Sequence, residues 1–340
     1  MDSIHQESIL QFKALVQQAA KLAVVGHTHP DGDALGAATG MALSLLSRGK
    51  KDVTCVFSDT PGENLRFILS REVPYCFHDQ EAEKAEAILR GADLIILLDC
   101  NAFDRTEALQ PFLEASPAWT VLIDHHLNPD RDRFDVVFST PEISSASELL
   151  YWVLKAMDWE VTVAAGTALL TGMTTDTNNF ANSVFPSTFR MASELIAAGI
   201  DRDALLQTLY NTCRENRVRL MGYMQYEGLK LLPCGGAYMI LTREIQQRFD
   251  LREGESEGLV NVPLTIGAVR LSLLLKEDQG HFRVSIRSKK GTSAQALAQR
   301  CFHGGGHENA SGGKLFIGPD ISSAEEAATY VENALKTFLK

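Results

Sequence analysis

The chain has 340 residues, of which 45% are hydrophobic and 22% are charged, and its formal net charge at pH 7 is −11. The length is typical of two domains, and the composition is typical of a globular protein. The acidic balance argues against a protein that holds long nucleic acid by neutralising its phosphates, and no apolar run approaches the ~20 residues of a membrane span.

The expected compartment follows from the N-terminus and the cysteines. Residues 1–7 lack the basic start and apolar core of a secretory signal. Six cysteines are scattered along the chain without Cys-x-x-Cys spacing. Such thiols are typical of a reducing compartment rather than of disulfides or zinc sites, so we expect a cytoplasmic protein.

The first 200 residues alternate between short apolar runs and helical patterns, starting with an amphipathic helix over residues 7–20. The expected strands cover residues 22–25, 53–57, 94–98 and 121–123, and the expected helices between them cover 34–46 and 81–89. This alternation predicts a doubly wound, mainly parallel sheet. Ser145 and Glu148 have the spacing of a capping box, which predicts that a helix begins before the apolar run 149–157.

The second half of the chain changes its pattern twice. Residues 187–232 are mostly helical in pattern, with a break at 199–201. We therefore expect a first domain over residues 1–200, a helical connector over 201–235 and a smaller domain over 236–340. In the smaller domain, strands are expected at 238–241, 268–275, 282–286 and 314–317, and helices at 294–300 and 324–339. This mixture predicts an α+β domain with a mixed sheet.

Four groups of acids and histidines follow apolar segments of the first domain. They are His27, Asp31 and Asp33; Asp99; Asp124, His125 and His126; and Asp176. The first three groups come directly after expected strands, whereas Asp176 follows a segment with a helical pattern. Because the carboxyl ends of parallel strands meet at one edge of a sheet, we expect these side chains to lie together.

The residue types in these groups indicate a divalent cation. Carboxylates and imidazoles without a thiolate suit Mn²⁺, with Mg²⁺, Co²⁺ or Zn²⁺ as alternatives. Six candidate ligands are too many for one ion that keeps an open position, and they suit two ions that share carboxylates: His27, Asp31, Asp33, Asp99, His125 and Asp176. A single aspartate at the end of a strand is usually a cap or turn residue, but the repeated pattern favours a metal site.

These motifs resemble those of the DHH phosphoesterase superfamily. The matching segments are His27-x-x-Pro30-Asp31-x-Asp33, the strand-end Asp99, Asp124-His125-His126 and Thr171-Gly172-x-x-x-Asp176-Thr177. Near the C-terminus, Gly304-Gly305-Gly306-His307 resembles the mark of the DHH-associated C-terminal domain. Domain order and length are similar to those of the short NrnA-type members, which cleave very short RNA and remove the 3′-phosphate of adenosine 3′,5′-bisphosphate.

The resemblance implies a role for each residue of the metal site. His27 and Asp31 would bind one ion, Asp33 and His125 the other, and Asp99 and Asp176 would be shared between them. The expected reaction is the attack on phosphorus of a hydroxide activated by the two metals. His126 would donate a hydrogen bond to the scissile phosphate, and Asp124 would orient the neighbouring histidine. His29 replaces the small polar residue expected at its position and is not counted as a ligand.

The same resemblance implies a substrate-binding segment in the smaller domain. Backbone amides of Gly304, Gly305 and Gly306 can approach an anion closely because glycine has no Cβ. The side chains expected to assist them are those of Arg287, Ser288 and His307. Residues 281–314 hold six Arg or Lys side chains against a single acid. A clamp across the cleft between the domains would favour substrates of about two to five nucleotides over long nucleic acid.

Other functions fit the same motifs. A phosphodiesterase of linear or cyclic dinucleotides (pApA, pGpG, c-di-AMP) differs only in its substrate, and nothing between residues 237 and 340 separates the two by inspection. A catalytically silent nucleotide-binding module is opposed by the complete set of ligands. The glycine-rich segment disfavours a phosphatase of pyrophosphate or polyphosphate. A homodimer is expected from the resemblance alone, and no membrane partner is expected.

Overall fold

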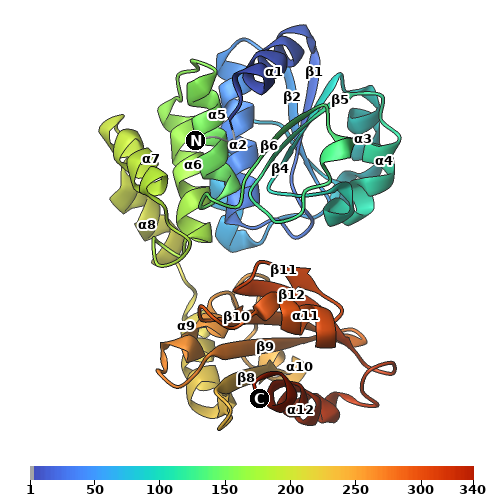
Figure 1. The fold of residues 1–340 in the computed structure, drawn as a ribbon, viewed down its shortest axis with the longest axis vertical. Coiled ribbons are helices and arrows are strands. Elements are labelled where there is room, and N and C mark those ends of the chain that lie inside the picture. The colour runs from blue at the N-terminus through green and yellow to red at the C-terminus, as the bar shows by residue number, and fades with distance from the viewer. Residues whose placement is uncertain (1–3) are drawn as a thin grey trace. The chain divides into compact units, whose positions relative to one another are not determined.

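The computed structural model describes residues 4–340. They form two compact units, and the chain passes from the first to the second between Thr212 and Cys213 (Figure 1). Each unit contains one six-stranded sheet with apolar clusters on both of its faces. Within the described residues, no helix is both long enough and apolar enough to cross a membrane.

The sheet of the first unit is parallel throughout. Its strands are β1 (Lys21–Val25), β2 (Asp52–Phe57), β3 (Tyr75–Phe77), β4 (Leu94–Leu98), β5 (Trp119–Asp124) and β6 (Val136–Ser139). They lie in the order β3-β2-β1-β4-β5-β6, with every neighbouring pair parallel. The chain builds outward from β1 in one direction and then returns to place β4 on the other side of β1. Sheets of this kind bind ligands beyond the carboxyl ends of the strands at the point of reversal.

Helices cover both faces of this sheet (Figure 1). They are α1 (Gln6–Gln18), α2 (Gly32–Ser47), α3 (His78–Gly91), α4 (Gln110–Glu114), α5 (Ala146–Ala156), α6 (Val163–Asp176), α7 (Pro186–Ala197) and α8 (Arg202–Tyr210). Leu22 and Val24 of β1 face a core shared with α1, α2, α5 and α6. Ala23 and Val25 face the opposite core, shared with α3 and α4. Alternate residues of one strand are thus buried on opposite faces, which confirms the predicted doubly wound sheet.

Glycines let α2 and α6 pack closely side by side. A Cβ at Gly36 would lie 2.6 Å from the carbonyl oxygen of Ala168 and 2.9 Å from the Cα of Gly172. A Cβ at Gly40 would lie 2.6 Å from the side chain of Leu169. The two helices run in opposite directions along this contact. The first turn of α2, which carries Asp33, therefore lies beside the last turn of α6.

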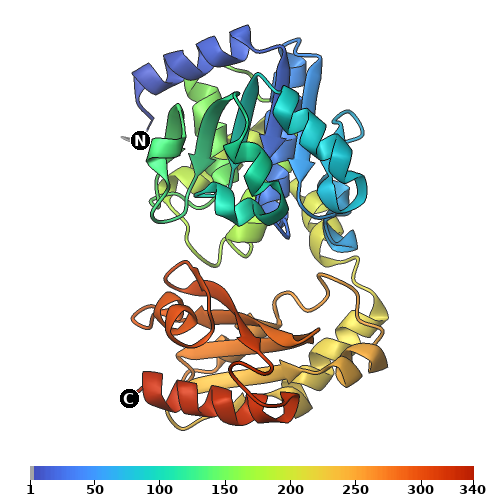
Figure 2. The same ribbon diagram turned by 90° about the vertical axis from the view of Figure 1, so that its right-hand side faces the viewer.

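The second unit contains a mixed sheet (Figure 2). Its strands are β7 (Lys230–Leu231), β8 (Gly236–Leu241), β9 (Leu271–Asp278), β10 (His281–Ser288), β11 (Gly305–Gly306) and β12 (Ala310–Phe316). The order is β11-β12-β10-β9-β8-β7, in which β8 and β9 are parallel and the other pairs antiparallel. One face packs on α11 (Ala294–Cys301) and α12 (Ala327–Phe338). The other face packs on α9 (Glu215–Tyr223), and α10 (Arg243–Arg248) follows β8.

The observed elements differ from the predicted ones mainly where strands are short or poor in large side chains. β3 and β6 contain three and four residues, too few to show a period in the sequence. β12 begins at Ala310, four residues before the expected strand. Ala310 to Gly313 pair with β10, but their small side chains give no strand pattern in the sequence. Residues 201–235 do not form a separate layer, because α8 lies in the first unit and α9 in the second.

Candidate metal centre

The acids and histidines of the first unit lie together at the carboxyl edge of its sheet. His27 follows β1, Asp99 follows β4 and Asp124 ends β5, so three adjacent strands deliver them. Asp33 lies in the first turn of α2, and Asp176 is the last residue of α6. The close contact of α2 with α6 is therefore what adds Asp176 to the residues from the strands.

Within the described residues of the first unit, three sets of side chains each bring three ligand atoms within 4.8 Å of one another, and two of these sets consist entirely of predicted metal ligands. The first set contains His27, Asp31 and Asp99. Nε2 of His27 lies 3.7 Å from Asp31 Oδ1 and 3.5 Å from Asp99 Oδ2. Nδ1 of His27 lies 2.7 Å from the carbonyl oxygen of Thr28 and must donate to it. This hydrogen bond fixes the tautomer in which Nε2 carries the lone pair that a cation needs.

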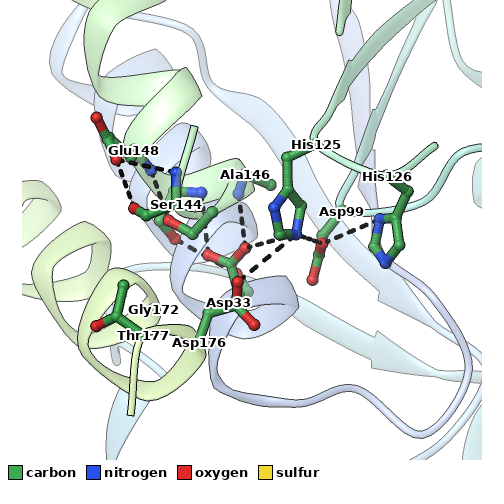
Figure 3. Close-up of polar contacts among 12 residues, drawn as sticks. Asp33, Asp99, His125, His126, Ser144, Ala146, Glu148, Gly172, Asp176 and Thr177 are labelled. Carbon is green, nitrogen blue, oxygen red and sulfur yellow. Dashed lines mark hydrogen bonds and ion pairs between the residues drawn. The ribbon is translucent and has the colours of Figure 1, made fainter. Parts of the chain in front are cut away.

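The second set contains Asp33, His125 and Asp176. Nε2 of His125 lies 4.0 Å from Asp33 Oδ2 and 3.7 Å from Asp176 Oδ2 (Figure 3). The side chains of Asp33 and His125 are buried, while that of Asp176 is 29% exposed. The set is therefore open to solvent on the side of α6.

Asp99 connects the two sets. Its Oδ2 faces His27, and its Oδ1 lies 3.3 Å from Nε2 of His125. Its side chain is only 3% exposed, yet Oδ1 accepts no hydrogen bond from any described residue. A buried carboxylate oxygen without a donor is costly unless a cation neutralises it. The residues present thus fit a divalent cation on either side of Asp99.

The pKa values of these groups show how strongly the charges interact in the protein without metal. Burial opposes a charge on His125, but the carboxylates around it, Asp99 first, outweigh burial and raise its pKa to about 10. Burial, with Asp99 close by, raises the pKa of Asp176 to about 6. Burial also disfavours the charge on Asp99, but His125 and His27 lower the pKa of Asp99 well below its usual range. In the metal-free protein, protons on His125 and Asp176 would therefore compete with divalent cations for these ligands.

Asp124 and His126 form a pair beside Asp99. Nδ1 of His126 lies 2.7 Å from Asp124 Oδ1, and Asp124 Oδ2 accepts the backbone N–H of His126 at 3.0 Å. Nδ1 of His126 also lies 3.7 Å from Asp99 Oδ1. Asp124 therefore fixes the orientation of the His126 ring.

The amino end of α5 holds the carboxylate of Asp33 (Figure 3). Oδ2 accepts the N–H of Ala146 at 2.7 Å, and Oδ1 accepts the N–H of Ser147 at 3.0 Å. As predicted, Ser145 caps this helix, since its hydroxyl accepts the N–H of Glu148 at 3.0 Å. The carboxylate of Glu148 does not return to the N–H of Ser145, as a capping box requires, and instead accepts the N–H of Ser144.

The segment expected to bind substrate lies at one end of the second sheet. A Cβ at Gly304 would collide with the carbonyl oxygen of Gly312, and one at Gly306 would lie 2.8 Å from that of Ala310. A Cβ at Gly305 would meet nothing within 4 Å. Two glycines of the run are therefore required by the packing of β11 on β12, and Gly305 leaves open space beside the chain.

The residues around this glycine run form local hydrogen bonds within the second unit. Ser288 is buried, and its hydroxyl donates to the carbonyl of Thr292 and accepts from Asn309, so it braces the loop after β10. Arg287 donates from Nη1 to the carbonyl oxygen of Ile286 at 2.9 Å. The backbone of His307 forms a turn with Ala310, in which each N–H donates to the other residue's carbonyl.

Two family models match the chain. The N-terminal domain of the DHH family matches residues 21–175, and the DHHA1 domain matches residues 237–337. This chain belongs to the DHH family. The parallel sheet with the candidate metal centre is thus its DHH domain, and the mixed sheet is its DHHA1 domain.

Named relatives of this DHH protein cover nearly the whole chain. A probable bifunctional oligoribonuclease and PAP phosphatase NrnA from Streptococcus mutans is 29% identical over 92% of this chain and 93% of its own length. A cyclic-di-AMP phosphodiesterase GdpP from Geobacillus thermodenitrificans is 25% identical, and the matched region is 44% of that protein. The crystal structure of an exopolyphosphatase-related protein from Bacteroides fragilis is 36% identical, has a TM-score of 0.91, and is matched over 99% of this chain and 97% of that one.

The residues that hold the loop containing His27 and Asp31 in place have no simple signal in the sequence. Asp59, which follows β2, accepts hydrogen bonds from the hydroxyl of Thr28 at 2.6 Å and the N–H of His29 at 2.7 Å. The carbonyl of Arg105 accepts the N–H of Thr28 at 2.9 Å. His29 adopts a positive φ of 49° and lies over Asp59, with 3.4 Å between Nδ1 and Oδ2. These contacts come from distant segments, so only the tertiary structure reveals them.

Proposed function

We propose that this hydrolase of the DHH family cleaves very short RNA, of about two to five nucleotides, to mononucleotides and converts adenosine 3′,5′-bisphosphate to AMP. The observation that carries the proposal is the Asp99 carboxylate, which is buried between two sets of candidate ligands and has one oxygen that accepts no hydrogen bond from the described residues. The name of the relative from Streptococcus mutans, which is similar over 92% of this chain, supports the choice of substrates.

We infer that two divalent cations, Mn²⁺ in preference to Mg²⁺ or Co²⁺, bind at the two sets. His27 and Asp31 would hold one cation, Asp33, His125 and Asp176 the other, and Asp99 would contact both. Asp176 is thus assigned to one cation, and not to both as the family resemblance implied, because among the described residues it groups only with Asp33 and His125. Such a pair of cations supplies a hydroxide at neutral pH and neutralises charge that develops on the phosphoryl oxygens. The protein supplies fixed ligands: the bond to Thr28 sets the tautomer of His27, and α5 fixes Asp33.

His126 is proposed to contact the scissile phosphate directly. Its Nδ1 is committed to Asp124, so the ring orientation is set before substrate binds. Nε2 can then donate a hydrogen bond to a phosphoryl oxygen as negative charge builds there. Asp124 acts only through His126 and is a positioning residue.

In the DHHA1 domain, we propose that Gly305, Arg287 and His307 bind the nucleotide portion of the substrate. The open space beside Gly305 lets its amide approach an anion. Arg287 adds a cation for a phosphate. Gly304, Gly306 and Ser288 support the same segment through its packing and hydrogen bonds. We also propose a cytoplasmic location, because the cysteines of the described residues are all free thiols. A homodimer is proposed on the family resemblance alone.

A second candidate is a phosphodiesterase acting on cyclic or linear dinucleotides. It is favoured by the 25% identity to a protein named cyclic-di-AMP phosphodiesterase, although the chain matches less than half of that protein. The metal centre is the same in both candidates. The choice between them therefore depends on the substrate test and not on the metal ligands.

The deciding experiment compares substrates for the purified protein with Mn²⁺. The panel contains a ribodinucleotide, a ribopentanucleotide, an RNA longer than about twenty nucleotides, cyclic di-AMP and adenosine 3′,5′-bisphosphate. We expect the two short RNAs and the bisphosphate to be hydrolysed and the long RNA to react far more slowly. Asp99→Asn should reduce every activity by at least ~10³-fold, because it removes the charge shared by both cations.

Different outcomes separate the candidates. Faster turnover of the long RNA would contradict the preference for short substrates. Hydrolysis of cyclic di-AMP alone would establish the second candidate. Mn²⁺ binding without hydrolysis of any substrate would indicate a silent binding module. Full activity of Asp99→Asn would contradict the two-cation arrangement.

A further inference from the structure

Glu148 is a fully buried carboxylate in the first turn of α5, the helix whose amino end holds Asp33 of the candidate metal centre. Four donors converge on it. Oε2 accepts the N–H and the hydroxyl of Ser144 and, at 2.7 Å, the hydroxyl of Thr188; Oε1 accepts Nε1–H of Trp152 at 3.2 Å. Because Thr188 lies in the first turn of α7, Glu148 joins the start of α5 to the start of α7. The mechanism proposed above gives this carboxylate no part.

The segment that contains Ser144, which donates to Glu148, also contains the amides that donate to Asp33. Ser144 and Ser145 precede α5, and the next two residues donate their N–H groups to the two oxygens of Asp33 (Figure 3). Both Asp33 and this segment are buried, so the segment has no solvent to replace a lost contact. A small displacement of the first turn of α5 would therefore also displace the Asp33 carboxylate.

We propose that Glu148 is a positioning residue, which fixes the first turn of α5 so that its amides hold the Asp33 carboxylate toward a divalent cation. The proposal deepens the proposed function and rests on it for the identity of the cation. Residues beyond the ligands that orient a metal ligand typically change metal affinity by 10–100-fold when they are replaced. Glu148 would act two steps from the cation, through the backbone of a helix.

Glu148→Gln tests the proposal with the least change in shape. One amide cannot satisfy the four donors: if its carbonyl faces Ser144 and Thr188, its own N–H groups face the donor of Trp152. We expect Mn²⁺ alone, titrated into metal-free protein by calorimetry, to bind about 10-fold more weakly than to wild type. In the metal-free protein, hydrogen exchange at the amides of Ala146 and Ser147 should become faster.

A matched control separates positioning from general stability. Tyr151 donates to Glu194 Oε2 at 2.6 Å and also joins α5 to α7, but away from the start of α5. Tyr151→Phe should lower the unfolding temperature and leave both Mn²⁺ affinity and the exchange of the Asp33-binding amides unchanged. Equal effects of the two variants on Mn²⁺ affinity would overturn the proposal, as would wild-type affinity in Glu148→Gln.

A second variant shows whether weaker Mn²⁺ binding in Glu148→Gln results from misfolding. In Glu148→Gln combined with Trp152→Phe, the conflict between the amide and the indole N–H is absent. We expect Mn²⁺ affinity to recover part of its loss, and no recovery in a folded double variant would count against the proposal. If the wild type binds no Mn²⁺, the proposed function fails, while unaltered amide exchange in Glu148→Gln would show separately that Glu148 does not seat Asp33.

Discussion

Asp99 adopts a left-handed backbone conformation, with φ of 56°, at the point where β4 ends. Such a conformation is unfavourable for a non-glycine residue and persists where the surroundings enforce it. Here the N–H of Asp99 donates to the carbonyl of Ile123 at 3.1 Å, which ties the turn to the neighbouring strand. The turn directs the carboxylate between His27 and His125 instead of into solvent.

Binding of Mn²⁺ should release protons, and the affinity should rise with pH. In the metal-free protein the carboxylates near His125, Asp99 first, raise its pKa to about 10, so its imidazole is protonated near neutral pH. A cation needs the neutral ring, so each increase in pH removes a competitor. Calorimetry of Mn²⁺ binding in buffers with different ionisation enthalpies measures the number of protons released, and repetition between pH 6.5 and 8.5 gives the slope.

The same shift affects the stability of the metal-free protein in the opposite direction. A histidine whose folded pKa is raised contributes stability that is complete below its unfolded pKa, ~6.5, and is lost as pH rises toward the folded value. As pH rises above about 6.5, the metal-free protein should therefore become less stable, while the affinity of the protein for Mn²⁺ increases. Proton uptake on binding, or an affinity independent of pH, would contradict this account of His125.

At the scale of elements, the contact of α2 with α6 brings Asp33 close to α6. A Cβ at Gly172 would lie 2.9 Å from Asp33 Oδ1 and would also collide with the hydroxyl of Ser147. Gly172→Ala should therefore displace Asp33 or push α6 away from α2. We expect a loss of stability of about 1–3 kcal/mol, as for overpacked cores, together with weaker Mn²⁺ binding. Chemical denaturation and calorimetry measure the two effects.

Gly91 provides the comparison for this substitution. It ends α3 in the same unit, and a Cβ there would meet nothing within 4 Å. Gly91→Ala should leave Mn²⁺ affinity and hydrolysis unchanged. Wild-type metal affinity in Gly172→Ala would show that the close approach of the helices does not set the position of Asp33.

At the scale of the whole molecule, the two units have separate cores, and all proposed metal ligands belong to the first. A ligand that binds only the folded state stabilises it by about 2.7 kcal/mol at a free concentration of 100 times its Kd. We expect Mn²⁺ to raise, and chelation to lower, the unfolding temperature of the first unit alone. Calorimetry combined with hydrogen exchange resolved by segment assigns each transition.

Two substitutions make this result specific. Asp99→Asn should remove the stabilisation by Mn²⁺ in the first unit. Gly305→Ala, in the second unit, should leave that stabilisation intact, because a Cβ there meets no neighbour. Equal stabilisation of both units by Mn²⁺ would indicate metal binding outside the proposed centre.

The sequence was informative where chemistry follows directly from a local pattern. Five consecutive apolar residues from Leu94 to Leu98 predicted a strand buried on both faces, and the structure confirms it. The position of Asp99 at the end of that strand followed from the same pattern. β3 and β6 were missed because so few residues show no period, and Asp59 was missed because an isolated acid after a strand usually has only a local role.

By itself, the sequence determined the fold class, the order of the elements and the set of candidate ligands, because strand periodicity and residue type are local properties. The tertiary structure alone decided which candidate ligands lie together, because the strand order places β4 beside β1 and glycine contacts place α6 beside α2. It also decided that Glu148 faces Ser144 and Thr188. Such contacts depend on segments far apart in the chain, and their geometry follows from packing.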